Sequence, residues 1–412
     1  MEKRNNEKFV IHGGKPLSGE IEVLGSKNAA TPLLAASILF EKAVTLDNIP
    51  LVEDVFRMID ILKSIGAKVS WLSKRKITID TSKLTPKSID QELVEMLRSS
   101  ILFIGPLLAR FGTCTIAHPG GCIIGARPLD THFQAFRDLG VEIKIEKGRK
   151  SNVYTFDARS LHGGEVILEE FSVTATENVL LLSSVLKEQV KVKLAACEPH
   201  VQDLIRFLQA GGVTIQKEGD HTLLVKGKKR LTPIVHRVVP DYIEAGTFLV
   251  LSHLYGGQIN VRNVPYEFLD AVVKKIRDVQ EGKPINIQTL PYPGFPTDLQ
   301  APFGVLATQL KGISRIHDPL YENRFGYLEE LKRMGAKAKL LNPHEAIIEG
   351  PTPLKGARIE SFDLRAGITL ILAGLIAKEK TVIHNAYQVD RGYERIDERL
   401  RMLGGHIERI SS

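Results

Sequence analysis

The chain has 412 residues, of which 43% are hydrophobic and 25% charged, and its formal net charge is +7. This composition excludes a disordered chain, and the length exceeds what one hydrophobic core usually supports, so we expect a globular protein with two domains. Aromatic residues make up only 6% and no arginine-rich helix stands out, so we expect no nucleic-acid partner; binding of small anions explains the positive charge as well.

The N-terminal residues 1–14 are charged, and they lack an apolar run that ends in a small-residue cleavage site. No stretch of eighteen apolar residues follows, so we expect a cytoplasmic protein without a membrane partner. The cysteines Cys114, Cys122 and Cys197 have no Cys-x-x-Cys spacing, so neither a disulfide framework nor a metal site is predicted. Cys114 and Cys197 stand in apolar strands and are expected in the core.

A repeat with a period of roughly 70 residues runs through the chain. Each repeat opens with a small-residue helix and a strand, in residues 28–49, 98–118, 176–197, 244–264, 298–318 and 365–386. An amphipathic helix follows, ended by glycine because the chain must turn there through a left-handed conformation, and a strand hairpin closes the repeat. These helices with their next strand are predicted in residues 52–71, 129–145, 201–216, 321–340 and 389–410.

The fourth repeat departs from this plan, because residues 269–288 pass from helix to strand without a hairpin. We expect a hairpin to be missing after Asp278, and that face of its domain to be less covered.

The sixth repeat ends at Ile410, and residues 9–23 match the closing strands of the other repeats. The two ends of the chain should therefore lie side by side. This predicts an α/β protein with a continuous domain over residues 27–240 and a discontinuous domain built from residues 1–26 and 241–412. Each domain then holds three repeats.

The first helix of each repeat is predicted to begin with polar residues, namely Lys27-Asn28, Arg98, Thr176-Glu177, Glu244, Asp298 and Arg365. Helix N-termini attract anions, so six such ends at one interdomain cleft would bind phosphate and carboxylate groups. Helix capping explains Thr176 and Glu244 equally well. Lysine and arginine are poor caps, so capping does not explain Lys27, Arg98 or Arg365.

Residues 117–128 form a loop rich in glycine and proline around Cys122, with Arg127 nearby. This composition is typical of a mobile lid. A cysteine beside an arginine in such a loop has either an exposed thiol of lowered pKa or an ordinary buried one, and the residues alone leave both readings open.

Seven stretches resemble the family of UDP-N-acetylglucosamine 1-carboxyvinyltransferases, which are enolpyruvyl transferases; they are residues 25–30, 119–130, 240–247, 295–300, 322–325, 363–365 and 390–395. The resemblance implies a two-domain inside-out α/β barrel, with pseudo-threefold symmetry in each domain and the active site between the domains. It implies transfer of the enolpyruvyl group of phosphoenolpyruvate to the 3-hydroxyl of UDP-N-acetylglucosamine, early in peptidoglycan synthesis, without a cofactor or metal.

The same resemblance assigns roles to individual residues. It makes Cys122 the general acid, Asp298 the base for the sugar hydroxyl, and Lys27, Arg127 and Arg391 the cations that hold phosphoenolpyruvate. It places substrate contacts at Asn28, Arg98, Arg127, Pro128, Leu129, Asp130, Thr131, Ser172, Val173, Asp298 and Leu320, and it makes Arg324, Asp363 and Arg365 residues that order the cleft. Closure over the sugar nucleotide is expected to bring acid and base together.

Two residues depart from the family pattern: Thr174 stands where many relatives have glycine, and Glu170 where some have a cation. Both predict weaker nucleotide binding. Three alternatives remain, namely a sister enzyme acting on shikimate 3-phosphate, a cyclase acting on RNA ends, and a non-catalytic protein that binds UDP-N-acetylglucosamine. The sequence gives no prediction of the oligomeric state.

Overall fold

The computed structural model describes residues 7–85, 89–120 and 128–411. These residues form two compact units, each with its own hydrophobic core. The discontinuous unit consists of residues 7–24 and 240–411, and the continuous unit lies within residues 25–239. The boundaries predicted after residues 26 and 240 lie two residues and one residue away from those observed.

The continuous unit repeats one order of elements, a buried helix, a strand, a second helix and a hairpin. The first repeat comprises α1 (Lys27–Ala36), β3 (Val44–Asp47), α2 (Glu53–Ser64), β4 (Lys68–Ser73) and β5 (Lys76–Asp80). The second comprises η2 (Arg98–Phe103), α4 (Ile104–Phe111), β6 (Thr113–Ala117), α5 (Asp130–Arg137), β7 (Glu142–Lys147) and β8 (Asn152–Asp157). The third comprises α6 (Val173–Ser183), β10 (Gln189–Lys193), α7 (Pro199–Ala210), β11 (Thr214–Lys217) and β12 (Thr222–Lys226).

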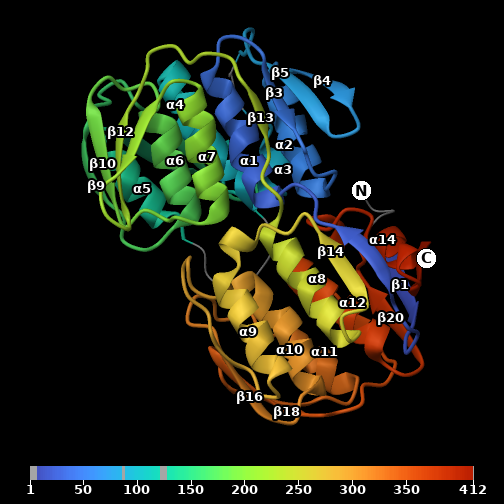
Figure 1. The fold of residues 1–412 in the computed structure, drawn as a ribbon. Helices are drawn as coiled ribbons and strands as arrows, with labels where there is room; N and C mark the ends of the chain where they lie inside the picture. Colours follow the sequence, from blue (N-terminus) through green and yellow to red (C-terminus); the bar gives the residue numbers. More distant parts are fainter. Residues whose placement is uncertain (1–6, 86–88, 121–127, 412) are drawn as a thin grey trace. The chain divides into compact units, whose positions relative to one another are not determined.

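The first helix of each repeat lies inside its unit, and most of its residues are buried. In α6, nine of eleven residues are buried. Helices α1, α4, α6 and α7 lie next to one another, and the hairpin strands cover them from outside (Figure 1). Strands β5 and β12 alternate buried positions with more exposed ones, as a sheet with one solvated face should.

The discontinuous unit follows the same order. Its first repeat comprises α8 (Tyr242–Leu254), β14 (Ile259–Arg262), α9 (Asp270–Gln280) and β15 (Asn286–Gln288). The next comprises η4 (Thr297–Leu299), α10 (Gln300–Gln309), β16 (Gly312–His317), α11 (Tyr327–Arg333), β17 (Lys337–Asn342), β18 (Glu345–Gly350) and β19 (Arg358–Glu360). The last comprises α12 (Leu364–Ile376), β20 (Lys380–His384), α13 (Tyr387–Asp390), α14 (Ile396–Met402) and β21 (His406–Ser411), and strands β1 (Glu7–His12) and β2 (Gly19–Glu22) complete the unit.

The two ends of the chain share a sheet, as predicted. Strand β1 lies between β20 and β21 and is antiparallel to both, with Lys8 opposite Ile410 (Figure 1). The first residues therefore supply the closing strand of the sixth repeat.

The missing hairpin of the fourth repeat is confirmed. Chain order runs directly from α9 to β15, and β14 pairs only with β2 in a two-stranded sheet among the described strands. Two of the eleven residues of α9 are buried, against six of twelve in α2. The helix is less covered because no hairpin packs on it.

The glycines after the amphipathic helices have the predicted left-handed backbone. They are Gly66, Gly140, Gly212, Gly335 and Gly404, with φ values from 84° to 101°. A side chain at such a position would be strained, so these glycines set where each helix turns into its hairpin.

Two predicted helix starts were wrong. Helix α6 begins at Val173, where the side chain of Ser172 accepts a hydrogen bond from the backbone N–H of Ala175. Thr176 and Glu177 therefore lie in the second turn and are buried. Helix α8 is capped by Asp241 rather than Glu244, whose carboxylate instead binds the buried Arg399 at 2.6 Å.

Among the described helices, none is both long and apolar enough to cross a membrane.

Candidate active site

The carboxylate of Asp298 lies between two guanidinium groups. Arg324 donates from Nη2 to Oδ1 at 2.6 Å, and Arg365 donates from Nη2 to Oδ2 at 2.9 Å. The Asp298 side chain is 21% exposed, whereas those of Arg324 and Arg365 are 8% and 9% exposed. The carboxylate thus faces solvent at one side and fixed positive charge at the other, which suits a group that must stay ionised to accept a proton.

Local structure fixes both arginines. Asp363 caps α12 by accepting hydrogen bonds from the backbone N–H groups of Arg365 at 2.7 Å and Ala366 at 3.0 Å. This cap sets the direction in which Arg365 leaves the helix. The Arg324 guanidinium lies 5.0 Å from the ring centre of Tyr321, and the backbone carbonyl of Arg324 accepts a hydrogen bond from the side chain of Gln300.

Electrostatics keep these arginines charged although they are buried. Burial alone would lower the pKa of each guanidinium, but the Asp298 carboxylate and other anionic neighbours raise both pKa values above the ordinary value. Helix capping alone would not explain the position of Asp298, because two arginine side chains bind its carboxylate.

Leu320 belongs to the same region. Its backbone N–H donates to Oδ1 of the buried Asp318 at 3.1 Å, and Oδ2 of Asp318 accepts the hydroxyl proton of Thr297 at 2.5 Å. The residue before Asp298 is thereby tied to the loop that carries Leu320.

Arg391 directly follows α13. Its Nη1 approaches Oε1 of Gln388 at 3.5 Å. The preceding Asp390 accepts two hydrogen bonds from Arg409, at 2.6 Å and 2.7 Å, so strand β21 fixes the segment that carries Arg391.

In the continuous unit, Lys27 is the first residue of α1. Its ammonium group lies 3.0 Å from Oδ2 of the buried Asp54 on α2. Ser26 caps the helix, so capping does not account for Lys27 or for the neighbouring Asn28. The carboxylate of Asp54 orients the ammonium group at the positive end of a helix.

The structure brings most other predicted contacts of this unit near one another. Helix η2, which begins with Arg98, packs against α1 and α6, and α5 packs against α6. Arg98 donates to the carbonyl of Pro128 at 3.4 Å. The side chain of Leu129 is buried, so only its backbone is available to a ligand, whereas Asp130, the first residue of α5, is exposed.

Both departures from the family pattern make contacts with α5. Thr131 donates to Oε1 of Glu170 at 3.3 Å, and Thr174 lies 2.9 Å from Nε2 of His132. These contacts hold the segment around Ser172 and Val173 against α5.

The three cysteines differ in setting. Cys122 and Arg127 lie outside the described residues. Cys114 is buried in β6 as predicted, and burial raises its pKa to about 12. Cys197 was predicted within a core strand, which was wrong: it follows β10 and is partly exposed because the chain leaves the sheet before α7.

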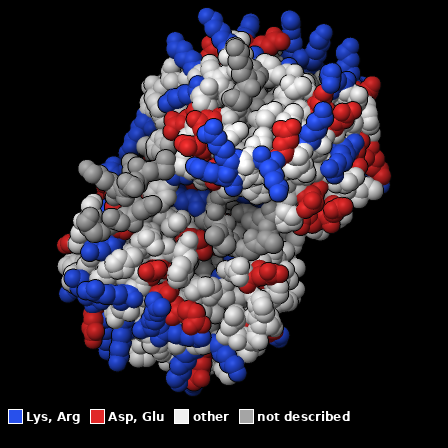
Figure 2. All heavy atoms as spheres, turned by 180° about the vertical axis from the view of Figure 1, so that it is seen from behind, with Lys and Arg blue, Asp and Glu red and all other residues white. Residues whose placement is uncertain are grey.

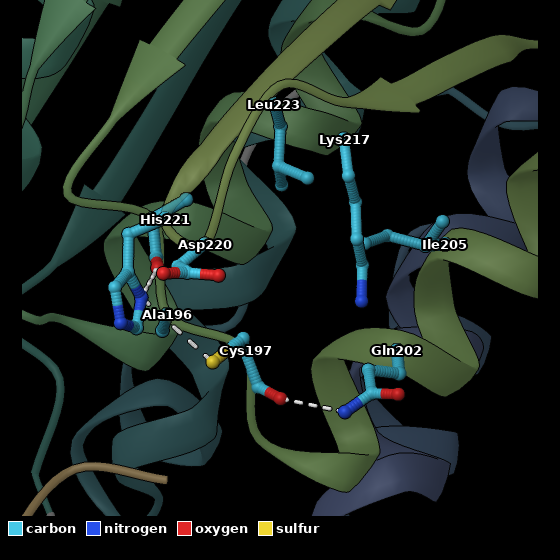
Figure 3. Close-up of a pocket in the computed structure, with 9 residues that line it drawn as sticks. Ala196, Cys197, Gln202, Ile205, Lys217, Asp220, His221 and Leu223 are labelled. Carbon is cyan, nitrogen blue, oxygen red and sulfur yellow. Dashed lines mark hydrogen bonds between the residues drawn. The ribbon is translucent and has the colours of Figure 1, made fainter. Parts of the chain in front are cut away.

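Cys197 lines a small pocket of the continuous unit (Figure 3). Its Sγ lies 3.8 Å from Nδ1 of His221, which also contacts the carbonyl of Ala195 at 3.1 Å. Burial, followed by the nearby Glu198, raises the pKa of the Cys197 thiol to about 11, so the thiol is protonated at neutral pH. This pocket contains none of the predicted site residues.

Basic side chains occur in runs near the ends of the hairpins; the exposed residues of these runs are Lys74, Lys147, Arg149, Lys150, Lys226, Lys228, Lys229 and Arg230. On the face seen in Figure 2, Lys and Arg are interspersed with Asp and Glu. Within the described ranges, no three His, Cys, Asp or Glu side chains are grouped in a way that could hold a metal ion.

Two residues beside Arg365 carried no predicted role. Tyr393 accepts a hydrogen bond from Nη1 of Arg365 at 3.3 Å, and the Tyr393 hydroxyl lies 2.9 Å from that of Thr247. Tyr393 lies within residues 390–395, one of the stretches that carried the resemblance. A tyrosine among these charged residues was the only sign in the sequence that it could have a role at the site.

Comparison with known proteins gives consistent matches over nearly the whole chain. Residues 11–281 and 270–400 match the family described as EPSP synthase (3-phosphoshikimate 1-carboxyvinyltransferase). A UDP-N-acetylglucosamine 1-carboxyvinyltransferase of Actinobacillus pleuropneumoniae serotype 3 (strain JL03) is 39% identical, covering 98% of this chain and 99% of its own. One of Coxiella burnetii (strain Dugway 5J108-111) is also 39% identical, covering 98% and 96%.

Solved structures share the fold at lower identity. The enolpyruvyl transferase NikO from Streptomyces tendae has a TM-score of 0.87 at 20% identity, covering 98% of this chain and 99% of its own. EPSP synthase from Acinetobacter baumannii has a TM-score of 0.76 at 19% identity, covering 98% and 100%.

Proposed function

Because the chain belongs to the EPSP synthase family of enolpyruvyl transferases, we propose that it transfers the enolpyruvyl group of phosphoenolpyruvate to the 3-hydroxyl of UDP-N-acetylglucosamine and releases phosphate. The observation that carries this proposal is the 39% identity, over 98% of the chain, to relatives named for this reaction. This reaction commits the sugar nucleotide to peptidoglycan synthesis in the cytoplasm. We further propose that the six repeats form the two threefold inside-out barrels of this fold.

The proposed chemistry is an addition followed by an elimination. In the addition, the sugar oxygen bonds to C2 of phosphoenolpyruvate while the methylene carbon C3 gains a proton. In the elimination, the C2–O bond to phosphate breaks and C3 loses a proton, which leaves an enolpyruvyl ether and inorganic phosphate. Atoms and charges balance without a metal or an organic cofactor.

Each proposed role matches the chemistry of its residue. Asp298 accepts the hydroxyl proton of the sugar, and its contacts with Arg324 and Arg365 favour the ionised form that a base requires. Cys122 supplies the proton to C3.

Three cations, Lys27, Arg127 and Arg391, bind the phosphate and carboxylate of phosphoenolpyruvate and stabilise the leaving phosphate. Both units thus contribute groups, with Lys27 in the continuous and Asp298 in the discontinuous unit.

The sugar nucleotide is assigned to a second set of residues. In the continuous unit these are Asn28, Arg98, Arg127, Pro128, Leu129, Asp130, Thr131, Ser172 and Val173, and in the discontinuous unit Asp298 and Leu320. Arg324, Asp363 and Arg365 order the base. Two residues are proposed to weaken nucleotide binding: Thr174, which replaces the glycine of many relatives, and Glu170, which replaces the cation of some.

The test is phosphate release from phosphoenolpyruvate with UDP-N-acetylglucosamine, beside the variants Cys122→Ser and Asp298→Ala. Release by the parent protein and its loss in both variants supports the proposal. Release only with shikimate 3-phosphate as acceptor would identify the sister reaction, which the family description makes the strongest competitor. Binding of the sugar nucleotide without any release would identify a non-catalytic protein.

A further inference from the structure

The buried Tyr393 lies directly behind the arginine that holds Asp298. Its hydroxyl oxygen is 3.3 Å from Nη1 of Arg365, and its ring centre is 5.7 Å from the guanidinium carbon. Tyr393 is 0% exposed and comes from the segment between α13 and α14. The other terminal nitrogen of Arg365, Nη2, donates to Asp298. One planar guanidinium therefore joins the tyrosine to the carboxylate.

The hydrogen bonds around Tyr393 have only one consistent direction. Thr247 has a single hydroxyl proton, and it donates this proton to the carbonyl of Ile243 one helical turn earlier, at 2.9 Å. The Tyr393 hydroxyl must then donate to Oγ1 of Thr247, also at 2.9 Å. Its oxygen lone pairs are left to accept the proton of Arg365, which can only donate.

Tyr393 keeps its proton at neutral pH, as this direction requires. Burial raises its pKa to about 12, although the positive charge of Arg365 acts in the opposite sense. A chain of donors thus runs from Arg365 through Tyr393 and Thr247 to the backbone of α8.

We propose that Tyr393, oriented by Thr247, is a positioning residue that fixes the plane of the Arg365 guanidinium and so aims Nη2 at Oδ2 of Asp298. A guanidinium is rigid and flat, so fixing one terminal nitrogen also fixes the other. This inference rests on the proposed function, because it assigns Tyr393 and Thr247 to the support of the proposed base.

The experiment compares Tyr393→Phe, Thr247→Val and the double variant with the parent protein. Tyr255→Phe is the matched control. The Tyr255 hydroxyl donates at 2.9 Å to the carbonyl of Leu375, at the opposite end of the helix that carries Arg365, and burial likewise raises the Tyr255 pKa to about 12. Both substitutions remove one hydroxyl that binds a residue of α12, but only one of these residues contacts Asp298.

In Tyr393→Phe we expect kcat to fall about tenfold, the size expected for one lost hydrogen bond to a charged group. KM for both substrates should change less than about twofold. The acidic limb of the pH profile of kcat should move to higher pH, because a less firmly held arginine stabilises the Asp298 carboxylate less.

Thr247→Val should change kcat in the same direction. The double variant should be no slower than Tyr393→Phe, because the two residues act through one contact. Tyr255→Phe should leave kcat and its pH profile unchanged even if it lowers the melting temperature.

A second measurement needs no turnover. The Nε–Hε signal of Arg365 in ¹⁵N-labelled protein, assigned by its loss in Arg365→Lys, should exchange faster with water in Tyr393→Phe and Thr247→Val than in Tyr255→Phe. An unchanged signal in Tyr393→Phe would overturn the inference, as would parental kcat with an unchanged pH profile, or a loss of kcat equal to that of the control. Absence of phosphate release by the parent protein would instead overturn the proposed function, and the exchange measurement then decides the inference alone.

Discussion

Arg365 reaches Asp298 from the second residue of a helix whose first turn is capped by Asp363, so the direction of the arginine depends on a helix cap. The two acidic residues therefore act on Arg365 in different ways. Asp363 fixes the backbone of Arg365, and Asp298 accepts a hydrogen bond from its guanidinium group.

Replacement of Asp363 tests this dependence. Asp363→Ala removes the cap and should cost about 1 kcal/mol of folding free energy, or roughly 2–4 °C in melting temperature. It should also lower kcat, because without the cap the first turn of α12 frays and no longer holds Arg365 in a fixed direction. Asp363→Asn retains a capping oxygen and should keep most of both properties. Equal losses in the alanine and asparagine variants, measured by calorimetry and phosphate release, would contradict this explanation.

Asp298→Asn tests the proposed base. An amide cannot take up the sugar proton, so kcat should fall by about 10²–10⁴-fold, the usual contribution of general acid–base catalysis. The melting temperature should fall as well, because the amide N–H₂ group now faces a guanidinium, donor against donor. Retention of more than a tenth of the parental kcat would show that another group takes the proton.

The thiols should react with very different ease. The thiolate is the reactive form, and the pKa values of about 12 for Cys114 and about 11 for Cys197 leave both as thiols at pH 8. Treatment with fosfomycin, an epoxide that alkylates the loop cysteine of this family, should therefore add one adduct by intact mass. The adduct should disappear in Cys122→Ser. Peptide mapping that places it on Cys114 or Cys197 would refute the assignment.

Glu177 should make the stability of the protein depend on pH. Burial, and then the charge of Glu198, raise the pKa of Glu177 well above its ordinary value of 4.5. The folded protein therefore binds this proton more tightly than the unfolded chain, and stability falls as the pH rises above about 4.5 toward the folded pKa. Glu177→Gln keeps a neutral side chain at every pH, so its melting temperature should rise relative to the parent between pH 5 and pH 8.

The control for this prediction is Glu146→Gln at an exposed position of β7. Its melting temperature should follow that of the parent across the same range. A constant difference between Glu177→Gln and the parent would mean that Glu177 does not titrate differently in the folded and unfolded states.

Much of the fold was predictable because each repeat consists of elements that short stretches of sequence reveal. Apolar helices, glycine ends and hairpins recur at one spacing, and the absence of one hairpin was visible as a short fourth repeat. The starts of α6 and α8 were less predictable. Ser172 and Asp241 are both good caps. A polar residue about one turn later, Thr176 or Glu244, looks from the sequence alone like an equally good start of the helix.

The candidate site was predictable only in part. Asp298, Arg324 and Arg365 come from three separate segments, and no local pattern shows that they meet. The repeat marked Asp298 and Arg365 as polar helix starts, but Arg324 and the roles of all three came only from the resemblance to a family. The contacts of Tyr393 with Arg365 and Thr247 depend on how α8 and α12 pack, which sequence periodicity does not determine.

The place of β1 between β20 and β21 sets an order of events during synthesis. The ribosome makes β1 before every other described strand, but it makes both partners of β1 only after residue 379. Residues 25–239 follow one another in the chain, so the continuous unit has all its strands while the C-terminal repeats are still being made. The N-terminal strand must wait unpaired through that time, and the sheet that joins the two ends of the chain is the last to form.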